Sequence, residues 1–567
     1  MIKEKYKLWL EKALNDPDIK SELIKIGNDE EAISDRFYKD LEFGTGGLRG
    51  EIGAGTNRMN VYTVGKATQG LSEYVNSVNK NGSVAIAYDS RIKSDVFART
   101  AASIFAANGI KVYIYKELMP TPMLSFAVRH FGCDAGVVIT ASHNPAKYNG
   151  YKAYGPDGCQ LNLEASNYVL SIMNKVDIFD GVKSMDFDEA VSNGIIRYIG
   201  EDVIEKYLNE VQKCSVADGI DLSGLNVIYT PLHGSGNKPV RAILDKIGIK
   251  NVTIVKEQEL PDGNFPTAPY PNPEIKQAFE IALKLAKDIK PDLLLATDPD
   301  CDRVGIAVRH NGEYRLMSGN DVGTLLFDYV LQRRTANGTM PKNPIAVKTI
   351  VTTEICKKIA AEYSCQLIDV LTGFKFIGEQ IGILEKSGEE DRYVFGFEES
   401  YGYLAGSYVR DKDAVIASML ICEMVAYYKQ KGVTLVDVLE GIYKKHGYYY
   451  CSQKSYTFEG EAGMKRIASI MDTLRSTPPT ELLGSPVVKI NDYENSVSII
   501  PSNGTKATID LPKSNVLSFF AEDDCSLIAR PSGTEPKIKF YLSAVAGTGE
   551  ACSKKLADLE VLTEKFI

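Results

Sequence analysis

The segment DLLLATDPDCDR, residues 292–303, joins a run of apolar residues to three aspartates at alternate positions. Its apolar part predicts a buried strand over 292–296 and then a loop at the carboxyl end of that strand, where open α/β sheets bind their ligands. Because alternate side chains point the same way in an extended or tightly looped backbone, Asp298, Asp300 and Asp302 are expected to converge. Converging carboxylates repel one another, and a hard cation such as Mg²⁺ relieves the repulsion, so the segment predicts a magnesium-type site.

Two other interpretations of these aspartates were weighed. An Asp-Pro-Asp segment on its own is an ordinary surface turn that needs no metal. A calcium-binding EF-hand loop also begins with alternating aspartates, but it requires Gly at its sixth position and Glu at its twelfth. Those positions hold Arg303 and Arg309, so the sequence excludes an EF-hand. Alternation directs the Cys301 thiol away from the carboxylates, and we expect it to contribute to packing.

The composition indicates a globular protein with several domains. A chain of 567 residues is too long for one hydrophobic core, and three to four domains are expected. The 74 acidic and 65 basic residues give a formal charge of −9, which argues against nucleic-acid binding but permits a local cationic cluster for an anionic substrate. The 10 cysteines and 5 histidines lack zinc-site spacing, and reduced cytosolic thiols are the simplest account.

The first residues predict a helix over 3–14 with an apolar face made of Tyr6, Trp9, Leu10 and Ala13. They lack the apolar centre of a signal peptide. No apolar run approaches the ~18 residues of a membrane span. We therefore expect a cytoplasmic protein without a membrane partner.

Alternating strands and helices follow, which is typical of a mostly parallel sheet. The pattern predicts a strand over 83–88 that runs into Asp89-Ser90-Arg91, a helix over 94–108 and a strand over 111–115. Before them, FGTGGLRG at 43–50 is rich in glycine, whose backbone amides approach anions closely, and Arg49 is suited to phosphate. Taken alone, these residues are better explained by a flexible glycine turn.

A serine follows the next predicted strand, 136–140, in the sequence ASHNP at 141–145. Ser142 is expected at the strand's carboxyl end, as a nucleophile or phosphoryl carrier, although a helix cap is an equal alternative. An extended backbone would direct His143 away from it. Lys152 lies ten residues further on and could return towards the serine, although a lone lysine usually faces solvent.

Later segments predict further stretches of alternating strands and helices. Strands are predicted over 225–229 and 392–395, with a rigid proline-rich loop over 260–273 between them. The second strand ends in GFEES at 396–400, whose Glu398, Glu399 and Ser400 suit sugar hydroxyls or form a polar turn. A helix is predicted over 413–431, capped by Asp413 and ended by Gly432.

The last block, about 450–567, shows shorter predicted strands and little alternation, which indicates a smaller α+β domain. Its centre is RPSGTEPK at 530–537. One arginine, two hydroxyls and a glycine amide within five residues suit a tetrahedral phosphate. A Pro/Gly hairpin is the alternative.

The order of four motifs, TASHNP at 140–145, the aspartate loop, GFEES and RPSGTEPK, resembles the α-D-phosphohexomutases over nearly the whole chain. The N-terminal helix, FGTGGLRG and FEESYG at 397–402 resemble their long phosphoglucomutase and phosphopentomutase branch. The resemblance implies an α/β fold of four domains around one cleft, three of them related α/β/α domains with mixed sheets and the last a smaller α+β domain. The expected domains are a phosphoserine domain with a helical extension, a metal-binding domain, a sugar-binding domain and a phosphate-binding domain, at 1–215, 216–320, 321–450 and 451–567.

The resemblance also implies roles for individual residues. Ser142 would carry the phosphoryl group and join the aspartates as a ligand of one Mg²⁺ per chain. The other expected catalytic residues are Lys152, His143, Arg49 and Arg303. The expected substrate-binding residues are Glu398, Ser400, Lys375, Arg530, Ser532, Gly533 and Thr534.

The implied activity is intramolecular phosphoryl transfer between glucose 1-phosphate and glucose 6-phosphate, with glucose 1,6-bisphosphate as intermediate and activator. A phosphopentomutase, a phosphomannomutase and a glucose 1,6-bisphosphate synthase are the enzymatic alternatives, and a non-catalytic sugar-phosphate-binding relative is another. Tyr401-Gly402-Tyr403 replaces the Gly-His that phosphomannomutases often carry after the sugar-loop serine, which favours glucose. A monomer or homodimer is expected.

Overall fold

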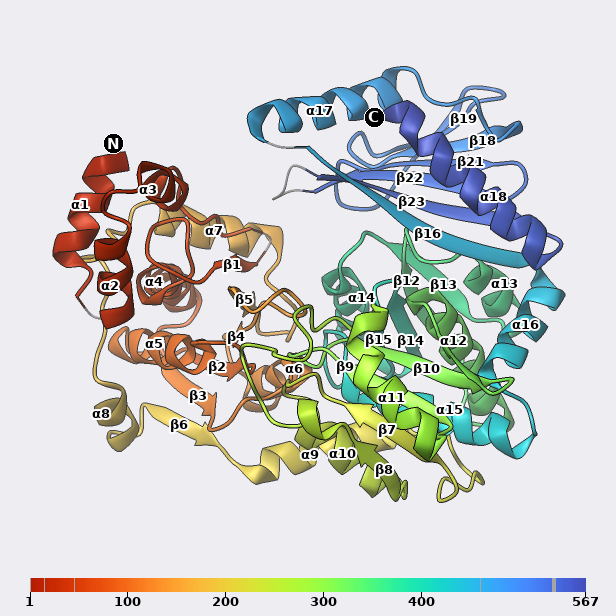
Figure 1. Cartoon of the computed structure of the whole chain (residues 1–567), viewed down its shortest axis with the longest axis horizontal. Helices are drawn as coiled ribbons and strands as arrows, with labels where there is room; N and C mark the ends of the chain where they lie inside the picture. Colours follow the sequence, from red (N-terminus) through yellow and green to blue (C-terminus); the bar gives the residue numbers. More distant parts are fainter. Residues whose placement is uncertain (1, 15, 45, 459, 533–536) are drawn as a thin grey trace. The chain divides into compact units, whose positions relative to one another are not determined.

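The structure is a computed structural model (Figure 1). Its chain divides into two units. The described residues are 2–14, 16–44, 46–458, 460–532 and 537–567. Unit 1 comprises residues 1–317, 378–393 and 401–430. Unit 2 comprises residues 318–377, 394–400 and 431–567.

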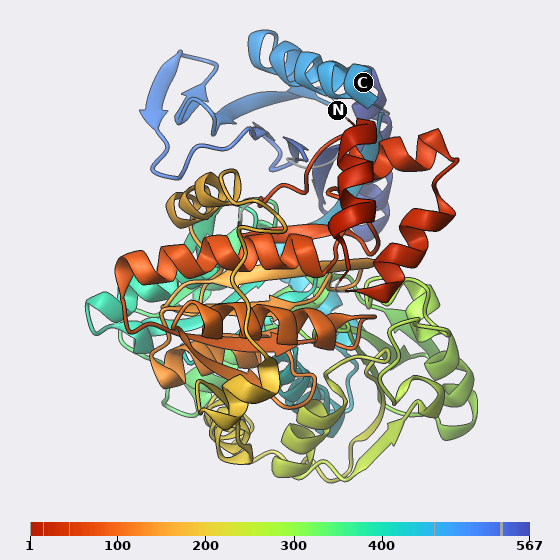
Figure 2. The same cartoon turned by 90° about the vertical axis from the view of Figure 1, so that its left-hand side faces the viewer.

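Unit 1 begins with three helices, drawn in red in Figure 2: α1 (Ile2–Lys12), α2 (Pro17–Lys25) and α3 (Glu30–Phe37). The predicted apolar face of α1 is confirmed, because Tyr6, Trp9 and Ala13 are buried and Leu10 is partly buried. The Trp9 ring meets Phe37 edge to face at a centroid distance of 5.7 Å. Aromatic contacts of this kind fasten the helices to one another.

The first sheet of unit 1 has six strands in the order β1-β5-β4-β2-β3-β6. They are β1 (Gly47–Glu51), β2 (Ser83–Tyr88), β3 (Lys111–Tyr115), β4 (Ala135–Ile139), β5 (Tyr148–Tyr154) and β6 (Ile196–Ile199). Its helices are α4 (Val61–Val78), α5 (Ser94–Ala107), α6 (Thr121–Phe131), α7 (Leu163–Met173), α8 (Phe187–Ser192) and α9 (Glu201–Lys213). The sheet is mixed, because β5 runs antiparallel to both β1 and β4 while β2, β3, β4 and β6 are parallel.

The second sheet of unit 1 carries the aspartate segment and has the order β11-β10-β9-β7-β8. Its strands are β7 (Asn226–Thr230), β8 (Asn251–Ile254), β9 (Leu293–Thr297), β10 (Val304–His310) and β11 (Glu313–Leu316). The helices of this part are α10 (Asn237–Lys246), α11 (Glu280–Ile289) and α15 (Ala414–Gln430). The predicted cap of α15 is confirmed, because Asp413 Oδ1 accepts from the amide of Val415 at 2.7 Å. The short strand β15 (Gly402–Leu404) precedes this helix.

Unit 2 contains three neighbouring strands in the order β13-β12-β14. They are β12 (Ile345–Thr349), β13 (Gln366–Val370) and β14 (Tyr393–Glu398), the last beginning one residue before unit 2 resumes. The helices of this part are α12 (Gly319–Ala336), α13 (Ile355–Glu362), the first residues of α14 (Phe374–Lys386) and α16 (Leu435–His446). The repeated α/β arrangement of the three parts is the predicted fold class.

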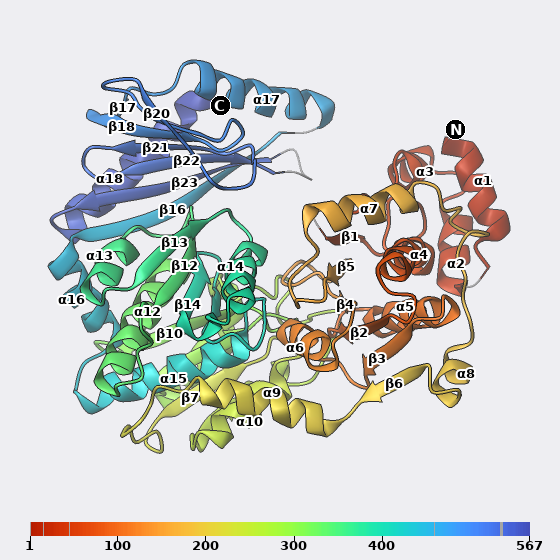
Figure 3. The ribbon, with the colours of Figure 1, turned by 180° about the vertical axis from the view of Figure 1, so that it is seen from behind.

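An antiparallel sheet closes the chain, in the order β16-β23-β22-β21-β18-β19-β20, with β17 beside β18. Its strands are β16 (Tyr448–Thr457), β17 (Glu481–Leu482), β18 (Ser485–Asp492), β19 (Val497–Ile500), β20 (Thr505–Thr508), β21 (Leu517–Ala521), β22 (Ser526–Pro531) and β23 (Lys537–Ala546). Helices α17 (Gly460–Ser476) and α18 (Gly549–Leu562) pack on it (Figure 3). The expectation of short strands was wrong, because β16 and β23 each extend over 10 residues. They pair along their full length, and that pairing is a long-range contact that local sequence does not reveal.

Candidate active site

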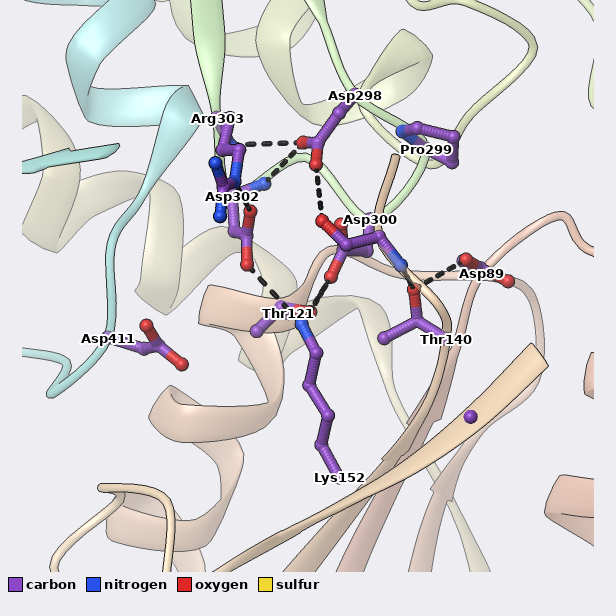
Figure 4. A network of polar contacts seen from close by, with 12 residues as sticks. Asp89, Thr121, Thr140, Lys152, Asp298, Pro299, Asp300, Asp302, Arg303 and Asp411 are labelled. Atoms are coloured by element: carbon purple, nitrogen blue, oxygen red, sulfur yellow. Dashed lines mark hydrogen bonds and ion pairs between the residues drawn. The ribbon is translucent and has the colours of Figure 1, made fainter. Parts of the chain in front are cut away.

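The three aspartates lie in the loop between β9 and β10, and they meet within unit 1 (Figure 4). One ligand oxygen from each of Asp298, Asp300 and Asp302 lies within 4.8 Å of the others, and all three residues are fully buried. The predicted convergence is confirmed. The loop is a tight turn rather than extended chain, because the amide of Cys301 donates to Asp298 O at 2.9 Å and Cys301 has a left-handed φ of 51°.

The Asp298 side chain organises this turn. Its Oδ1 atom accepts from the backbone amides of Asp302 and Arg303 at 3.1 and 3.0 Å. The thiol of Cys301 is buried next to Gly236, as expected for a packing residue. The loop therefore fixes its own carboxylates before any ligand arrives.

Two carboxylate oxygens in the cluster, Asp300 Oδ1 and Asp302 Oδ1, are buried and have no hydrogen-bond partner among the described residues. Such atoms are costly to bury, and a metal ion satisfies them. Three carboxylates form an all-oxygen donor set, which suits Mg²⁺, Mn²⁺ or Ca²⁺ rather than zinc. The residues present thus fit a hard divalent cation.

Two lysines face the aspartates. Lys152 Nζ, from β5, lies 2.9 Å from Asp300 Oδ2 and 3.5 Å from Asp302 Oδ2. Lys412 Nζ lies 2.9 Å from Asp302 Oδ2. Burial opposes the charge of Lys152, but Asp300 and Asp302 raise the pKa of its ammonium above the usual value. The Lys152 side chain does turn back into the site, where its contacts are with Asp300 and Asp302.

The carboxylates respond differently to this environment. Burial, together with the charges of Asp300 and Asp302, raises the pKa of Asp298 well above its usual value. Burial also opposes ionisation of Asp300, but the adjacent ammonium group of Lys152 lowers its pKa below the usual range. Lys152 thus holds Asp300 ionised, whereas burial and its two neighbouring aspartates oppose the charge on Asp298.

Sequence reasoning missed Lys412 and its neighbour Asp411. Asp411 Oδ2 accepts from Tyr154 Oη at 2.7 Å, while its Oδ1 lies 3.3 Å from Lys412 Nζ. Three charged residues at 410–412 directly before the cap of an apolar helix were the available signal. The sequence gives no indication that this segment returns to the aspartate loop.

Ser142 is held with its hydroxyl directed at the cluster. Its Oγ donates to Asp298 Oδ2 at 2.9 Å, and its amide donates to Thr140 Oγ1 at 2.8 Å. The residue is 4% exposed and adopts a left-handed φ of 53°. The helix-cap alternative is wrong, because the chain continues through a turn into β5.

The prediction that His143 points away from Ser142 was also wrong. The left-handed turn brings His143 Nδ1 to 3.2 Å from Ser142 Oγ. Burial and then the positive charges of Arg303 and Arg49 hold the pKa of His143 well below its usual value. The ring is therefore neutral near pH 7.

The two predicted arginines occupy different positions. Arg303 Nη1 lies 3.0 Å from Glu274 Oε1, and its Nε lies 3.8 Å from Asp302 Oδ1. Arg49 is exposed on β1, paired in register with Gly150. The amides of Gly44 and Gly46 donate to Gly47 O and Gly44 O, so these two glycine amides close a turn and do not face an anion.

Thr121, at the first position of α6, also contacts Asp300 (Figure 4). Its hydroxyl donates to Asp300 Oδ2 at 2.8 Å, and its amide donates to Asp300 O at 2.9 Å. The sequence around Thr121 carries no charge that would have marked it. It was missed because its function arises only from the contact between two segments of the chain.

The remaining predicted residues belong to unit 2. Glu398 is buried, and its Oε1 accepts from the amide of Gly373 at 2.9 Å. Lys375 Nζ lies 5.1 Å from the centre of the Phe376 ring, and Ser400 is half-buried. Arg530 Nη1 lies 3.4 Å from Tyr541 Oη, and the amide of Ser532 donates to Lys537 O at 2.7 Å. Gly533 and Thr534 lie outside the described residues.

Comparison with known proteins now identifies the class. Models of the phosphoglucomutase/phosphomannomutase α/β/α domains I, II and III match residues 40–178, 205–312 and 318–446. The chain belongs to the phosphoglucomutase/phosphomannomutase family.

Among its relatives, a phosphoglucomutase of Staphylococcus saprophyticus is 38% identical and the match covers 94% of this chain and 96% of that protein. A phosphoglucomutase of Staphylococcus aureus is also 38% identical, with coverage of 94% and 95%. Of the solved structures, the open form of parafusin from Paramecium has a TM-score of 0.70 at 18% identity and covers 93% of this chain and 95% of its own. A family member from Burkholderia thailandensis has a TM-score of 0.66 at 17% identity, covering 92% and 97%. These two structures share the fold.

Across the described part of the chain, the search for a helix long and apolar enough to cross a membrane finds none.

Proposed function

We propose that this protein is a phosphoglucomutase, which interconverts glucose 1-phosphate and glucose 6-phosphate through a phosphoserine at Ser142. The observation that carries the proposal is the buried Ser142 hydroxyl, 2.9 Å from an aspartate of a three-carboxylate cluster with unsatisfied oxygens. Family membership and the phosphoglucomutase relatives at 38% identity support it.

Asp298, Asp300 and Asp302 are proposed to hold one Mg²⁺ per chain, together with an oxygen of the Ser142 phosphate. The bound cation neutralises charge on the transferring phosphoryl group. A phosphoserine adds about −1.5 to −2 charge to the cluster. Lys152, Arg49 and Arg303 are proposed to balance that charge.

In the proposed first step, the 6-hydroxyl oxygen of glucose 1-phosphate attacks phosphorus, and the bond between phosphorus and Ser142 Oγ breaks. The sugar hydroxyl gives its proton to a base, for which the neutral His143 is the candidate, and Ser142 Oγ takes up a proton from an acid, for which the charged Lys152 is the candidate. Glucose 1,6-bisphosphate results. After it reorients, its 1-phosphoryl group passes to Ser142 Oγ, and glucose 6-phosphate leaves with a proton on O1.

Unit 2 is proposed to bind the rest of the substrate. Glu398 and Ser400 suit sugar hydroxyls, and Lys375 suits an anionic oxygen. Arg530, Ser532, Gly533 and Thr534 are proposed to bind the phosphate that does not react. The domain ranges 1–215, 216–320, 321–450 and 451–567 stay a prediction, with the last boundary falling inside β16. A cytoplasmic monomer or homodimer is proposed for the whole protein.

The other activities have less support. The relatives at 38% identity are named phosphoglucomutase, which does not favour a phosphopentomutase or phosphomannomutase. A non-catalytic relative would not need the serine, three aspartates and two lysines brought together here.

The deciding experiment compares Mg²⁺-dependent turnover of glucose 1-phosphate, mannose 1-phosphate and ribose 1-phosphate, each with catalytic amounts of the matching bisphosphate. We expect kcat/KM for glucose 1-phosphate to exceed the others at least about tenfold, equivalent to roughly 1.4 kcal/mol. Faster ribose turnover would replace the substrate and keep the serine chemistry. Full turnover by Ser142→Ala would refute the phosphoserine itself.

A further inference from the structure

The segment that carries Ser142 lies between two strands and forms neither helix nor strand from Ser142 to Lys147. Backbone carbonyls in such a segment need partners other than a helix or sheet ladder. One side chain supplies several of them. Arg91, 2% exposed, follows β2 in the Asp89-Ser90-Arg91 sequence noted above.

The Arg91 guanidinium donates to four carbonyl oxygens of this segment. Its Nη2 donates to Ser142 O and Asn144 O at 2.5 Å each. Its Nη1 donates to Pro145 O and Tyr148 O at 3.0 Å each. Hydrogen bonds from a charged donor are stronger than neutral ones, and the planar fork of arginine fixes their directions.

Arg91 is itself held in place by Asp89. Its Nε lies 3.3 Å from Asp89 Oδ2, and its amide donates to Asp89 Oδ1 at 2.9 Å. Thr140 Oγ1 donates to Asp89 Oδ2 at 2.6 Å while it accepts from the Ser142 amide at 2.8 Å (Figure 4). Asp89 therefore contacts both Arg91 and Thr140, and Thr140 in turn accepts from the amide of Ser142.

The proline-rich loop covers the other side of Arg91. The guanidinium carbon lies 5.1 Å from the centre of the Phe265 ring, a cation–π distance. Gly263 approaches so closely that a Cβ there would lie 2.4 Å from the amide nitrogen of Ile92. The proline-rich loop therefore packs directly against the segment that carries Arg91.

We propose that Arg91, held by Asp89 and Thr140, is a positioning residue that keeps Ser142 in its left-handed conformation with Oγ directed at Asp298. A non-glycine residue at positive φ is strained and persists only where its surroundings fix it. The four carbonyl contacts fix the chain on the carboxyl side of Ser142, and Thr140 fixes it on the amino side. The consequence for catalysis rests on the phosphoserine chemistry proposed above.

The first test uses no substrate. Hydrogen exchange of the amides between residues 142 and 149 is measured in the unmodified protein and in Arg91→Lys, which keeps the charge and loses the fork. We expect exchange in this segment to be at least about tenfold faster, while the strands of the second sheet are unchanged. Arg58→Lys is the matched control, because Arg58 is buried, pairs with Asp35 and donates to one backbone carbonyl.

The second test measures turnover of glucose 1-phosphate. Arg91→Lys should lower kcat at least about 30-fold with KM within about threefold, since Ser142 is displaced while phosphate binding elsewhere is kept. Thr140→Val should act in the same direction, and Thr140→Ser should restore kcat to within about threefold of the unmodified protein. Arg58→Lys should change neither value.

Unchanged exchange in both Arg91→Lys and Thr140→Val would overturn the proposal, as would equal losses in Arg91→Lys and Arg58→Lys. If Arg91→Lys does not fold, the Thr140 pair decides by itself. If the unmodified protein does not turn over glucose 1-phosphate, the proposed function fails, and the exchange comparison still decides the role of Arg91.

Discussion

Two buried charge clusters, one in each unit, are built from the same residue types and differ in their balance. In unit 1, Asp298, Asp300 and Asp302 face two ammonium groups, and two of their oxygens have no hydrogen-bond partner among the described residues. In unit 2, two lysines face two carboxylates around the end of β12. The first cluster sets three carboxylates against two ammonium groups, with the Arg303 guanidinium 3.8 Å from Asp302, and the second sets two carboxylates against two ammonium groups.

The unit 2 cluster centres on Lys348, which is fully buried. Its Nζ lies 2.8 Å from both Glu354 Oε1 and Asp369 Oδ1, and it donates to Thr352 O at 3.2 Å. Lys357 lies 3.3 Å from Asp369 Oδ2 and also contacts Glu354. Although burial opposes their charges, Lys348 and then Lys357 lower the pKa values of Glu354 and Asp369.

The difference teaches how a binding site is distinguished from a structural ion-pair network. A network that serves only the fold satisfies its own charges, because a buried charge without compensation is costly. A metal site keeps an excess of carboxylate groups, whose repulsion the bound cation relieves. Four predictions test this contrast, from the largest expected effect to the smallest.

Asp298→Asn should lower turnover of glucose 1-phosphate by about 10⁴-fold, equivalent to roughly 5 kcal/mol, because it removes a proposed metal ligand. The same change should not lower the thermal midpoint of the metal-free protein, since it relieves carboxylate repulsion. Steady-state kinetics and thermal unfolding in the presence of EDTA check the two parts. Activity within tenfold of the unmodified protein would contradict the proposed ligand.

Lys348→Met should destabilise unit 2 by about 3–5 kcal/mol, because Glu354 and Asp369 then stay buried without their shared partner. Hydrogen exchange of β12 and β13 measures the effect. Lys357→Met is the control, since its side chain is 49% exposed and should cost less than about 1 kcal/mol. Equal effects of the two variants would show that burial of Lys348 is unimportant.

Asp328, on α12, is a half-buried carboxyl group outside both clusters. Burial raises its pKa to about 6, and Tyr363 Oη donates to it at 3.4 Å. Below about pH 4 it is protonated in both the folded and the unfolded chain. Between about pH 4 and 6 only the unfolded chain ionises, so stability falls as pH rises, by up to about 3 kcal/mol.

Asp328→Asn should therefore be more stable than the unmodified protein at pH 7, and this advantage should vanish by about pH 4. Asparagine still accepts from Tyr363, so the hydrogen bond is kept. Urea unfolding of both proteins at the two pH values gives the difference. An advantage that is the same at both pH values would exclude titration of Asp328 as its cause.

Thr121→Val should weaken divalent metal binding about tenfold, equivalent to roughly 1.4 kcal/mol, because Asp300 loses one hydrogen bond that fixes its carboxylate. Thr121→Ser keeps the hydroxyl and should bind as the unmodified protein does. Titration with Mn²⁺, read as free ion by electron paramagnetic resonance, measures affinity without turnover. Identical Mn²⁺ affinity of the valine and serine variants would show that the Thr121 hydroxyl does not contribute to metal binding.

Much of the fold and half of the site followed from local sequence. Apolar runs with turn residues on either side predicted five strands of unit 1 (β2, β3, β4, β7 and β9) to within one residue, because burial on both faces leaves a continuous apolar signal. The antiparallel C-terminal sheet was predicted less well, since β16 pairs with β23 across about 80 residues of chain and carries a half-exposed pattern. Periodicity alone does not reveal such partners.

The sequence by itself determined that three aspartates follow a buried strand, that a serine ends another, and that their order matches one family. Only the tertiary structure decided which groups meet them. Lys412 and Thr121 reach the aspartates from distant segments, as Arg91 reaches the serine loop. His143 turns back because Ser142 adopts a left-handed backbone. The physical reason is that residue type and spacing fix local geometry, whereas burial, hydrogen-bond partners and charge balance depend on which segments pack together.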